Sequence, residues 1–266
     1  MKTLTLIGLG LHDESGISLR GLEEAKTAEH VFIELYTNLM PNLSLDRLEH
    51  ILGKKPVIVS RKDLEENNGK IVLEAAKKGK TVLLVPGDPL IATTHVALRL
   101  EAKKQNIKTL IIHGTSILSA IIGLSGLHSY KFGKSVTIPF PDENPSETPY
   151  EAIRQNKQRG LHTLCLLDVK AEEKRYLTIR EALNSLIETE KRRKKQIISP
   201  NTLAVGVARA GSPEPTVKAG PVGELLCYDF DGPPHSLVFP GKLHFIEAEA
   251  LITFAEAPQN LREKAA

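Results

Sequence analysis

The chain has 266 residues, 41% of them hydrophobic and 25% charged, which is typical of a globular protein with one large or two ordinary domains. Its formal net charge of +3 and sequence pI near 8.7 are too mildly basic to indicate a nucleic-acid-binding protein. Its two cysteines, Cys165 and Cys227, lie far apart and without metal-ligand spacing, which excludes a disulfide framework and a structural zinc site.

The first residues, MKTLTLIGLGL, differ from a signal peptide, because one lysine and a brief apolar run lead at once into glycine and acid. No apolar run reaches the roughly 18 residues that a membrane-spanning helix needs. Cys165 lies within an apolar run and is expected to be an inert core residue. We therefore expect a soluble, cytoplasmic protein of a reducing compartment, without a membrane partner.

Short apolar runs alternate with helical patterns over residues 1–112 and predict a first α/β domain built on a parallel sheet. Ser18 is the expected N-cap of the first helix. The expected strands are 3–7, 31–35, 57–59, 81–86 and 109–112, and the expected helices are 19–28, 43–52, 71–78 and one that ends at 105.

The stretch TVLLVPGDPL, Thr81–Leu90, predicts a strand buried on both faces that ends at a Pro-Gly-Asp-Pro turn. Asp88 and Pro89 fit the N-cap and first position of the next helix. Asp88 could instead bind a ligand, because ligands of open α/β sheets bind outside the carboxyl ends of the strands. The turn Gly114-Thr115-Ser116 also follows a probable strand and could face the same cleft, although its hydroxyls also fit helix capping.

The glycine turn at Gly8 and Gly10 resembles a dinucleotide fingerprint, with Glu34 near the position of a ribose-binding acid. The third glycine is missing, however, and Asp13 and Glu14 would face a pyrophosphate. The following helix also begins too late to cradle a phosphate. Nicotinamide or flavin binding is therefore disfavoured, and a turn that brings another ligand close to the backbone is better supported.

Residues 113–260 predict a second α/β domain, which contains a proline-rich, acidic loop at 141–149. The run KRRKK at Lys191–Lys195 continues the polar end of a helix and is read as a solvated surface rather than as a contact for an acidic or RNA-bearing partner. The expected strands are 137–140, 162–167, 203–208, 216–219 and 236–239, and the expected helices are 117–124, 150–158, one around 179–187 and 243–254.

Several segments in the same order make the chain resemble the diphthine synthases, members of the tetrapyrrole-methylase superfamily of S-adenosylmethionine-dependent methyltransferases. The Gly-Asp-Pro turn marks only the superfamily, whereas YKFGKS, LHTLCLLDVKAEE and PPHSL narrow the resemblance. The segments are IGLGL at 7–11, PGDPL-ATTH at 86–95, TSILSA at 115–120, GLHSYKFGKS at 126–135, GLHTLCLLDVKAEE at 160–173, ARAGS at 208–212 and PPHSLVFPGKLHFIEAE at 233–249.

The resemblance implies two α/β domains with a cofactor cleft between them, a homodimer, and S-adenosyl-L-methionine as cofactor. It implies repeated methylation of the amino group of 3-amino-3-carboxypropyl-histidine on translation elongation factor 2, which gives diphthine, without direct nucleic-acid contact or a metal. By matching segments, the implied cofactor contacts are Leu11, Asp88, Ile91, Ser116, Ile117, Leu167, Ala210 and His235.

The resemblance names no catalytic residue. Water, His235 or a substrate carboxylate could each take the proton that the amine loses before it attacks the methyl group. Two alternatives remain for the activity: another methylase of the superfamily, acting on a corrinoid, a porphyrinoid or RNA, and a non-catalytic protein that only binds S-adenosylmethionine.

Overall fold

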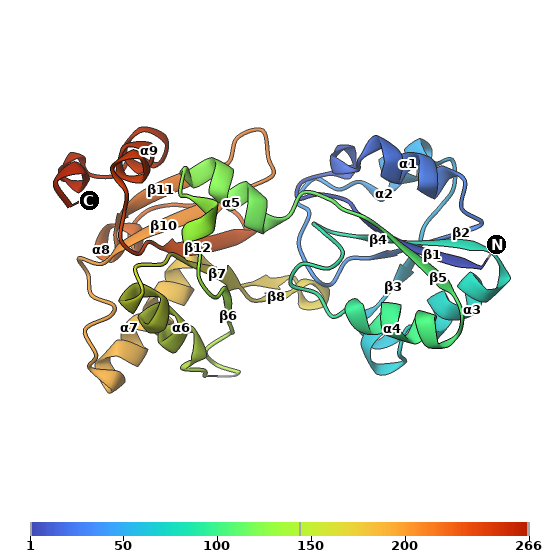
Figure 1. Cartoon of the computed structure of the whole chain (residues 1–266), viewed down its shortest axis with the longest axis horizontal. Coiled ribbons are helices and arrows are strands. Elements are labelled where there is room, and N and C mark those ends of the chain that lie inside the picture. The colour runs from blue at the N-terminus through green and yellow to red at the C-terminus, as the bar shows by residue number, and fades with distance from the viewer. Residues whose placement is uncertain (1, 144, 265–266) are drawn as a thin grey trace. The chain divides into compact units, whose positions relative to one another are not determined.

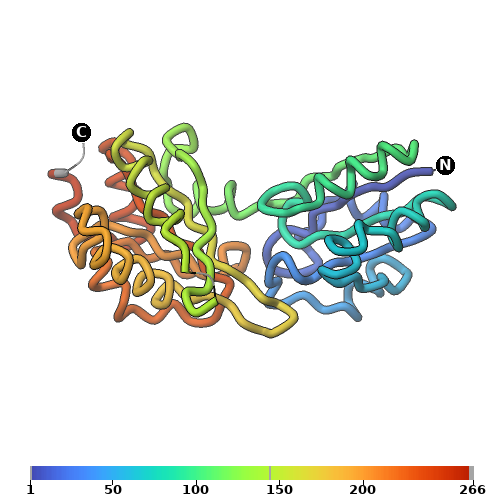
Figure 2. Tube along the Cα trace, turned by 90° about the horizontal axis from the view of Figure 1, so that it is seen from below, coloured from blue at the N-terminus to red at the C-terminus, as the bar shows by residue number. Residues whose placement is uncertain are grey.

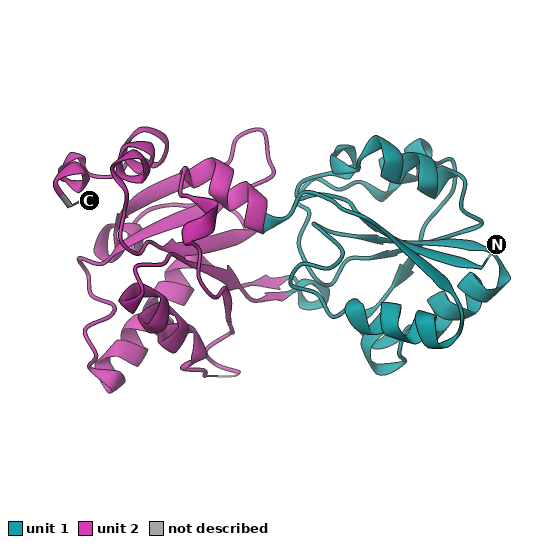
Figure 3. Cartoon of the chain, viewed as in Figure 1, with its two compact units in different colours: residues 1–117, 170–174 teal, residues 118–169, 175–266 magenta. Residues whose placement is uncertain are grey.

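The computed structural model describes residues 2–143 and 145–264, which divide into two compact units (Figure 3). Unit 1 runs to Ile117 and also includes Lys170–Lys174, and unit 2 holds Leu118–Val169 and the chain from Arg175 onward. The chain begins in unit 1 and ends in unit 2 (Figure 2). The sequence places the domain boundary after Ile112, slightly earlier, and gives no sign that Lys170–Lys174 belongs with the first unit.

Unit 1 is built on a five-stranded sheet in which all strand pairs are parallel, as the continuous apolar runs predict. The strand order is β3-β2-β4-β1-β5, so β1 and β4, which lead into the two predicted glycine turns, are neighbours. The strands are β1 (Thr3–Gly8), β2 (His30–Glu34), β3 (Val57–Val59), β4 (Lys80–Val85) and β5 (Lys108–Ile112).

Helices cover both faces of this sheet: α1 (Leu19–Lys26) and α2 (Leu45–Leu52) lie on one face, and α3 (Lys70–Lys78) and α4 (Val96–Lys104) on the other (Figure 1). The side chains of successive β4 residues point to opposite faces of the sheet. Leu83 packs in the core beneath α3 and α4, while Leu84 packs in the core beneath α1 and α2. Ser18 caps α1 as predicted, because its hydroxyl accepts the Gly21 N–H at 3.1 Å.

The prediction that Asp88 and Pro89 start the helix after β4 is wrong. An irregular loop follows β4, and α4 begins only at Val96, with His95 at its N-cap. The later start also places other residues in the core: Leu98 is buried, whereas Val96 is 54% exposed. The Gly-Asp-Pro turn therefore leads into a loop, which leaves the Asp88 carboxylate free for a role other than helix capping.

Unit 2 contains a mixed five-stranded sheet with the order β11-β10-β12-β7-β6, in which only β6 and β7 pair in parallel. A two-stranded sheet of β8 and β9 was not predicted from the sequence. The strands are β6 (Val136–Ile138), β7 (Thr163–Leu167), β8 (Val169–Lys170), β9 (Arg175–Tyr176), β10 (Leu203–Ala208), β11 (Thr216–Pro221) and β12 (His235–Phe239).

The helices of unit 2 also lie on both faces of its sheet: α6 and α7 cover one face, and α5 and α9 the other (Figure 1). Cys165 is buried in the core beneath α6 and α7, and burial raises the pKa of its thiol, as expected for an inert residue. The helices are α5 (Ile117–Ser125), α6 (Thr148–Gln158), α7 (Ile179–Arg193), α8 (Val222–Leu225) and α9 (Phe245–Ala255).

The basic run at the end of α7 behaves as a solvated helix terminus. Lys191 pairs with Glu188 at 2.7 Å and Arg193 with Glu147 at 3.3 Å, and all four side chains are substantially exposed. Cations in the last turn of a helix also interact favourably with the helix dipole. Two of the five basic residues of the run thus pair with acids of unit 2, as expected for a solvated helix end.

Candidate functional site

Three glycines meet where β1, β4 and β5 of unit 1 end. A Cβ atom on Gly8 would lie 2.5 Å from both the Gly114 nitrogen and the Gly87 oxygen, and one on Gly114 would lie 2.4 Å from the Gly87 oxygen. No side chain fits at such distances, so the backbones of all three turns come into direct contact. This places both predicted glycine turns and the Gly114 turn together at the carboxyl-terminal edge of a parallel sheet, where α/β proteins bind their ligands.

Backbone hydrogen bonds join the first glycine turn to the Gly-Asp-Pro turn. The Gly10 N–H donates to the Gly87 carbonyl at 3.2 Å, and the Gly87 N–H donates to the Gly10 carbonyl at 2.6 Å. The Leu9 N–H donates to the Val85 carbonyl at 2.8 Å. These bonds bring Leu11 beside Gly87, so two of the predicted contact residues, Leu11 and Asp88, lie on adjacent turns.

The Asp88 carboxylate is buried, only 4% exposed, and faces a solvent-exposed histidine. Its Oδ1 accepts the Leu90 N–H at 3.0 Å, which closes the turn, and its Oδ2 lies 2.7 Å from the Nδ1 of His113. The His113 side chain is 72% exposed. A carboxylate can accept several hydrogen bonds, so Asp88 retains acceptor capacity at this edge of the sheet.

The other predicted residues of unit 1 flank these turns. Ile91 is exposed on the loop that follows Asp88, and Ser116 and Ile117 are partly buried where α5 begins. The structure thus places all five predicted unit 1 residues at or beside the ends of β1, β4 and β5. His113 was not predicted as a site residue, although its position directly after an expected strand was a signal that could have identified it.

The predicted residues of unit 2 lie at one end of its sheet. Ala210 follows β10, His235 begins β12 and Leu167 ends β7. The antiparallel register pairs Ala208 with His235 and Ser236 with Leu166, so three positions distant in the chain become neighbours. The end of this sheet therefore offers two apolar side chains and one imidazole.

Hydrogen bonds within unit 2 fix the His235 ring. Its Nδ1 accepts the Ile179 N–H at 3.4 Å, and its Nε2 lies 3.2 Å from the Asp231 carbonyl oxygen, to which it donates. Burial lowers the pKa of His235, which favours the neutral ring. Because both ring nitrogens are engaged, His235 is poorly placed to accept a proton from a substrate.

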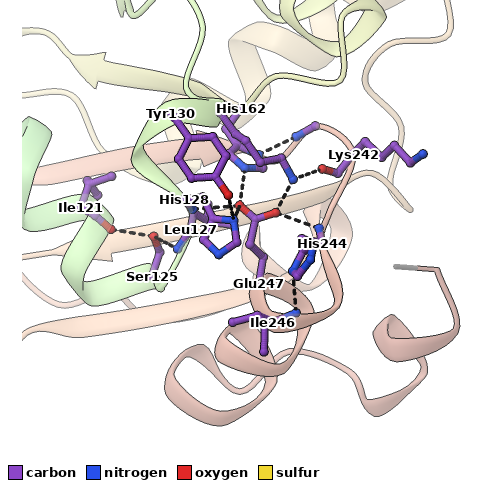
Figure 4. A network of polar contacts seen from close by, with 12 residues as sticks. Ile121, Ser125, Leu127, His128, Tyr130, His162, Lys242, His244, Ile246 and Glu247 are labelled. Carbon is purple, nitrogen blue, oxygen red and sulfur yellow. Dashed lines mark hydrogen bonds and ion pairs between the residues drawn. The ribbon is translucent and has the colours of Figure 1, made fainter. Parts of the chain in front are cut away.

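A second buried acid, Glu247, lies at the opposite end of β7 from Leu167, and Figure 4 shows its partners. Its Oε1 accepts the His162 Nε2–H at 2.9 Å and the His128 N–H at 2.8 Å. Its Oε2 accepts the His244 N–H at 2.8 Å and a hydrogen bond from the Lys131 ammonium. We call this group the Glu247 cluster.

Hydrogen bonds and the nearby lysine charge keep the Glu247 carboxyl ionised. Burial alone would raise the pKa of Glu247, but the His244 N–H, the Lys131 ammonium and the other donors lower it to about 2. The second nitrogen of His162 accepts the Gly241 N–H at 2.9 Å, and burial lowers the pKa of its ring. Glu247 thus ties three chain segments together, and its donors already come from the protein itself.

Comparison with known proteins identifies the family. A family model described as Tetrapyrrole (Corrin/Porphyrin) Methylases matches residues 3–226. The chain belongs to this tetrapyrrole methylase family. Diphthine synthase from Methanocaldococcus jannaschii is 49% identical over 251 residues, which cover 93% of this chain and 97% of that protein. Diphthine synthase from Methanosarcina mazei is 46% identical over 266 residues, with 98% of each chain covered.

A solved structure agrees with this assignment. A crystal structure of diphthine synthase matches with a TM-score of 0.89 and 42% identity and covers 99% of this chain and 100% of that one. The resemblance and the α/β fold predicted from the sequence motifs are therefore confirmed. The chain is a methyltransferase, and its full-length relatives place it in diphthamide biosynthesis. Among the described residues, no helix is long and apolar enough to cross a membrane.

Proposed function

We propose that this methyltransferase transfers methyl groups from S-adenosylmethionine to the amino group of 3-amino-3-carboxypropyl-histidine on translation elongation factor 2, repeatedly, to give diphthine. The observation that carries the proposal is the 49% identity to a diphthine synthase over 93% of this chain. The carboxyl-terminal edge of the unit 1 sheet supports it, because a backbone-lined edge suits a ligand that binds mainly through N–H and C=O groups.

The residues present fit S-adenosylmethionine. Its adenine, ribose and aminoacyl tail need apolar walls and a small number of polar contacts, and the turns at Gly8, Gly87 and Gly114 gather backbone groups at one edge of the sheet. We assign the side-chain polar contacts to Asp88 and Ser116, and a contact through its main chain to His235, because both of its ring nitrogens are engaged within unit 2. The apolar contacts are assigned to Leu11, Ile91, Ile117, Leu167 and Ala210.

S-adenosylmethionine supplies a methyl group on a positively charged sulfur, so its leaving group needs no acid. What the chain must supply is position and exclusion of water. The bonded pair of Gly10 and Gly87 holds two turns in a fixed relation, and Asp88 fixes the start of the following loop. Such pre-formed geometry lowers the entropic cost of bringing the amine and the methyl group into line.

The proton of the substrate amine needs an acceptor before each methyl transfer. His235 donates from one ring nitrogen and accepts at the other, so proton uptake there would break a hydrogen bond within unit 2. We therefore assign the proton to water or to the substrate's own carboxylate. This assignment predicts that His235→Gln lowers the affinity for the cofactor more than it lowers kcat.

The proposed activity is tested with labelled S-adenosylmethionine and elongation factor 2 that carries the 3-amino-3-carboxypropyl group. Mass spectrometry should find added methyl groups on the modified histidine. Elongation factor with an unmodified histidine is the matched control and should gain none. Binding of S-adenosylmethionine without transfer would instead favour the non-catalytic alternative, and transfer to a corrinoid, a porphyrinoid or RNA would favour another methylase activity.

We further propose that the protein acts in the cytoplasm as a homodimer that contacts its elongation-factor substrate without direct nucleic-acid binding. This proposal follows from the resemblance to diphthine synthases. Light scattering on the purified protein should give a molar mass of two chains, and a monomeric mass at the assay concentration would contradict it.

A further inference from the structure

A buried acid and a buried histidine pair in unit 1, outside the predicted contact residues. Glu34 ends β2 and is fully buried, and His95, which is 2% exposed, stands at the N-cap of α4. The His95 Nε2 lies 3.3 Å from Glu34 Oε1. The two residues come from separate crossovers of the parallel sheet, so the pair joins the end of one strand to the start of a distant helix.

The surroundings of Glu34 hold its carboxylate in one orientation. Its Oε2 accepts the Tyr36 N–H at 2.9 Å and the Thr37 N–H at 3.1 Å, and its Oε1 accepts a hydrogen bond from the Thr37 hydroxyl. A carboxylate surrounded by donors acts only as an acceptor, so the hydrogen of this contact is on the His95 Nε2, which donates to Glu34 Oε1. Glu34 is thus a fixed point to which His95 is attached.

His95 ends the loop that carries Ile91. This loop, Pro89–His95, begins directly after Asp88, whose carboxylate accepts the Leu90 N–H. Between its ends the loop makes local or exposed hydrogen bonds: the Ile91 N–H donates to the Asp88 carbonyl at 3.3 Å, the Thr93 hydroxyl to the Pro89 carbonyl at 2.7 Å, and the Thr94 hydroxyl to the exposed Glu65 at 3.0 Å. The buried attachments of the loop are therefore Asp88 at its start and His95 at its end.

We propose that Glu34 and His95 are positioning residues that hold the loop Pro89–His95 in the conformation that binds the methyl donor. The inference rests on the proposed function, because it takes Asp88 and Ile91 as contacts of S-adenosylmethionine. Neither Glu34 nor His95 touches the donor; they act through the loop. Without the pair the loop must be ordered when the donor binds, and that ordering lowers affinity.

The experiment is a calorimetric titration of S-adenosylhomocysteine into the wild-type chain, Glu34→Gln, His95→Leu and the double variant. His95→Leu keeps the volume and removes the donor, while Glu34 keeps its three bonds to Tyr36 and Thr37. Loss of a hydrogen bond to a charged group should raise Kd about tenfold in each single variant. Because both substitutions break the same contact, between His95 and Glu34, the double variant should bind no more weakly than the weaker-binding single variant.

Steady-state kinetics provide a readout that a merely structural role would not change. KM for S-adenosylmethionine should rise about as much as Kd, about tenfold, while kcat at saturating donor stays near the wild-type value. Glu65→Ala is the matched control, because it removes the exposed acceptor of the Thr94 hydroxyl on the same loop and should change Kd less than about twofold.

The outcomes separate this inference from the proposed function. If folded His95→Leu binds S-adenosylhomocysteine as tightly as the wild type, the inference is overturned even when its melting temperature falls. If Glu34→Gln does not fold, His95→Leu still provides the test. A wild-type chain that neither binds the ligand nor transfers methyl groups would overturn the proposed function itself.

Discussion

The buried carboxylates of Asp88 in unit 1 and Glu247 in unit 2 differ in what surrounds the acid. In the Glu247 cluster of unit 2, a lysine, a histidine and two backbone N–H groups all donate to Glu247. At the carboxyl-terminal edge of the unit 1 sheet, Asp88 meets one backbone N–H and one exposed histidine, beside turns that leave no room for side chains. Burial of an acid therefore does not by itself predict a binding site, and our proposal for Asp88 rests on its remaining acceptor capacity and on its place at the carboxyl-terminal edge of the sheet.

Lys131→Met should have the largest effect, on the free energy of unfolding. It removes the ammonium partner of a fully buried carboxylate, and loss of one member of a buried pair costs about 3–5 kcal/mol. Urea denaturation measures the loss. Lys77→Met is the control, because Lys77 and Glu74 are both exposed and their pair should contribute less than about 1 kcal/mol. Equal losses in the two variants would show that the Glu247 cluster is not a stabilising anchor.

Acid should destabilise the protein through Glu247. The pKa of this group falls from its model-peptide value of 4.5 to about 2 on folding, so the unfolded chain binds its proton first as pH falls. Stability from Glu247 is thus present above pH 4.5 and is lost between pH 4.5 and about 2, by on the order of 3 kcal/mol. Unfolding measured across this range should show a shallower pH dependence in Glu247→Gln.

Asp88→Ala should weaken donor binding with little effect on folding. Asp88 does not cap α4, so its loss leaves that helix start intact, while removal of a charge-assisted hydrogen bond should cost about 1.5–3 kcal/mol of binding free energy. Calorimetric titration with S-adenosylhomocysteine measures the cost. Unchanged affinity in a folded variant would limit Asp88 to closing the turn with Leu90.

Alanine substitutions at Gly123 and Gly8 should change stability in opposite directions, and Gly123→Ala should have the smallest effect of these variants. Nothing lies within 4 Å of a Cβ on Gly123 in α5, so Gly123→Ala should stabilise the protein by about 0.5–1 kcal/mol. Gly8→Ala would place its Cβ 2.5 Å from two backbone atoms and should reduce both stability and donor affinity. Thermal unfolding of both variants tests the contrast, and a harmless Gly8→Ala would contradict the contact among the three turns.

Local patterns in the sequence were sufficient for most elements of the fold. The parallel sheet of unit 1 and the Ser18 cap follow from apolar runs and from a hydroxyl just before a helical pattern. The start of α4 did not follow, because Asp-Pro after a strand also fits a helix N-terminus, whereas the helix begins at Val96, after a loop whose last residue, His95, contacts Glu34.

Part of the candidate site could be predicted in the same way. Glycine turns after buried strands predicted that these turns meet at one edge of the sheet, because the carboxyl ends of parallel strands share one edge. The attachment of Asp88 to His113 and of Glu34 to His95 joins residues 25 and 61 positions apart. Such pairs depend on strand order, which hydropathy patterns do not specify.

The most direct test of the central claim is hydrogen–deuterium exchange with and without S-adenosylhomocysteine. We expect slower exchange with the ligand at Leu9–Leu11, Gly87–Ile91 and Gly114–Ile117, and no change in the segments of the Glu247 cluster around Lys131 and His244. Protection confined to the Glu247 cluster, or none at the three glycine turns at saturating ligand, would contradict it.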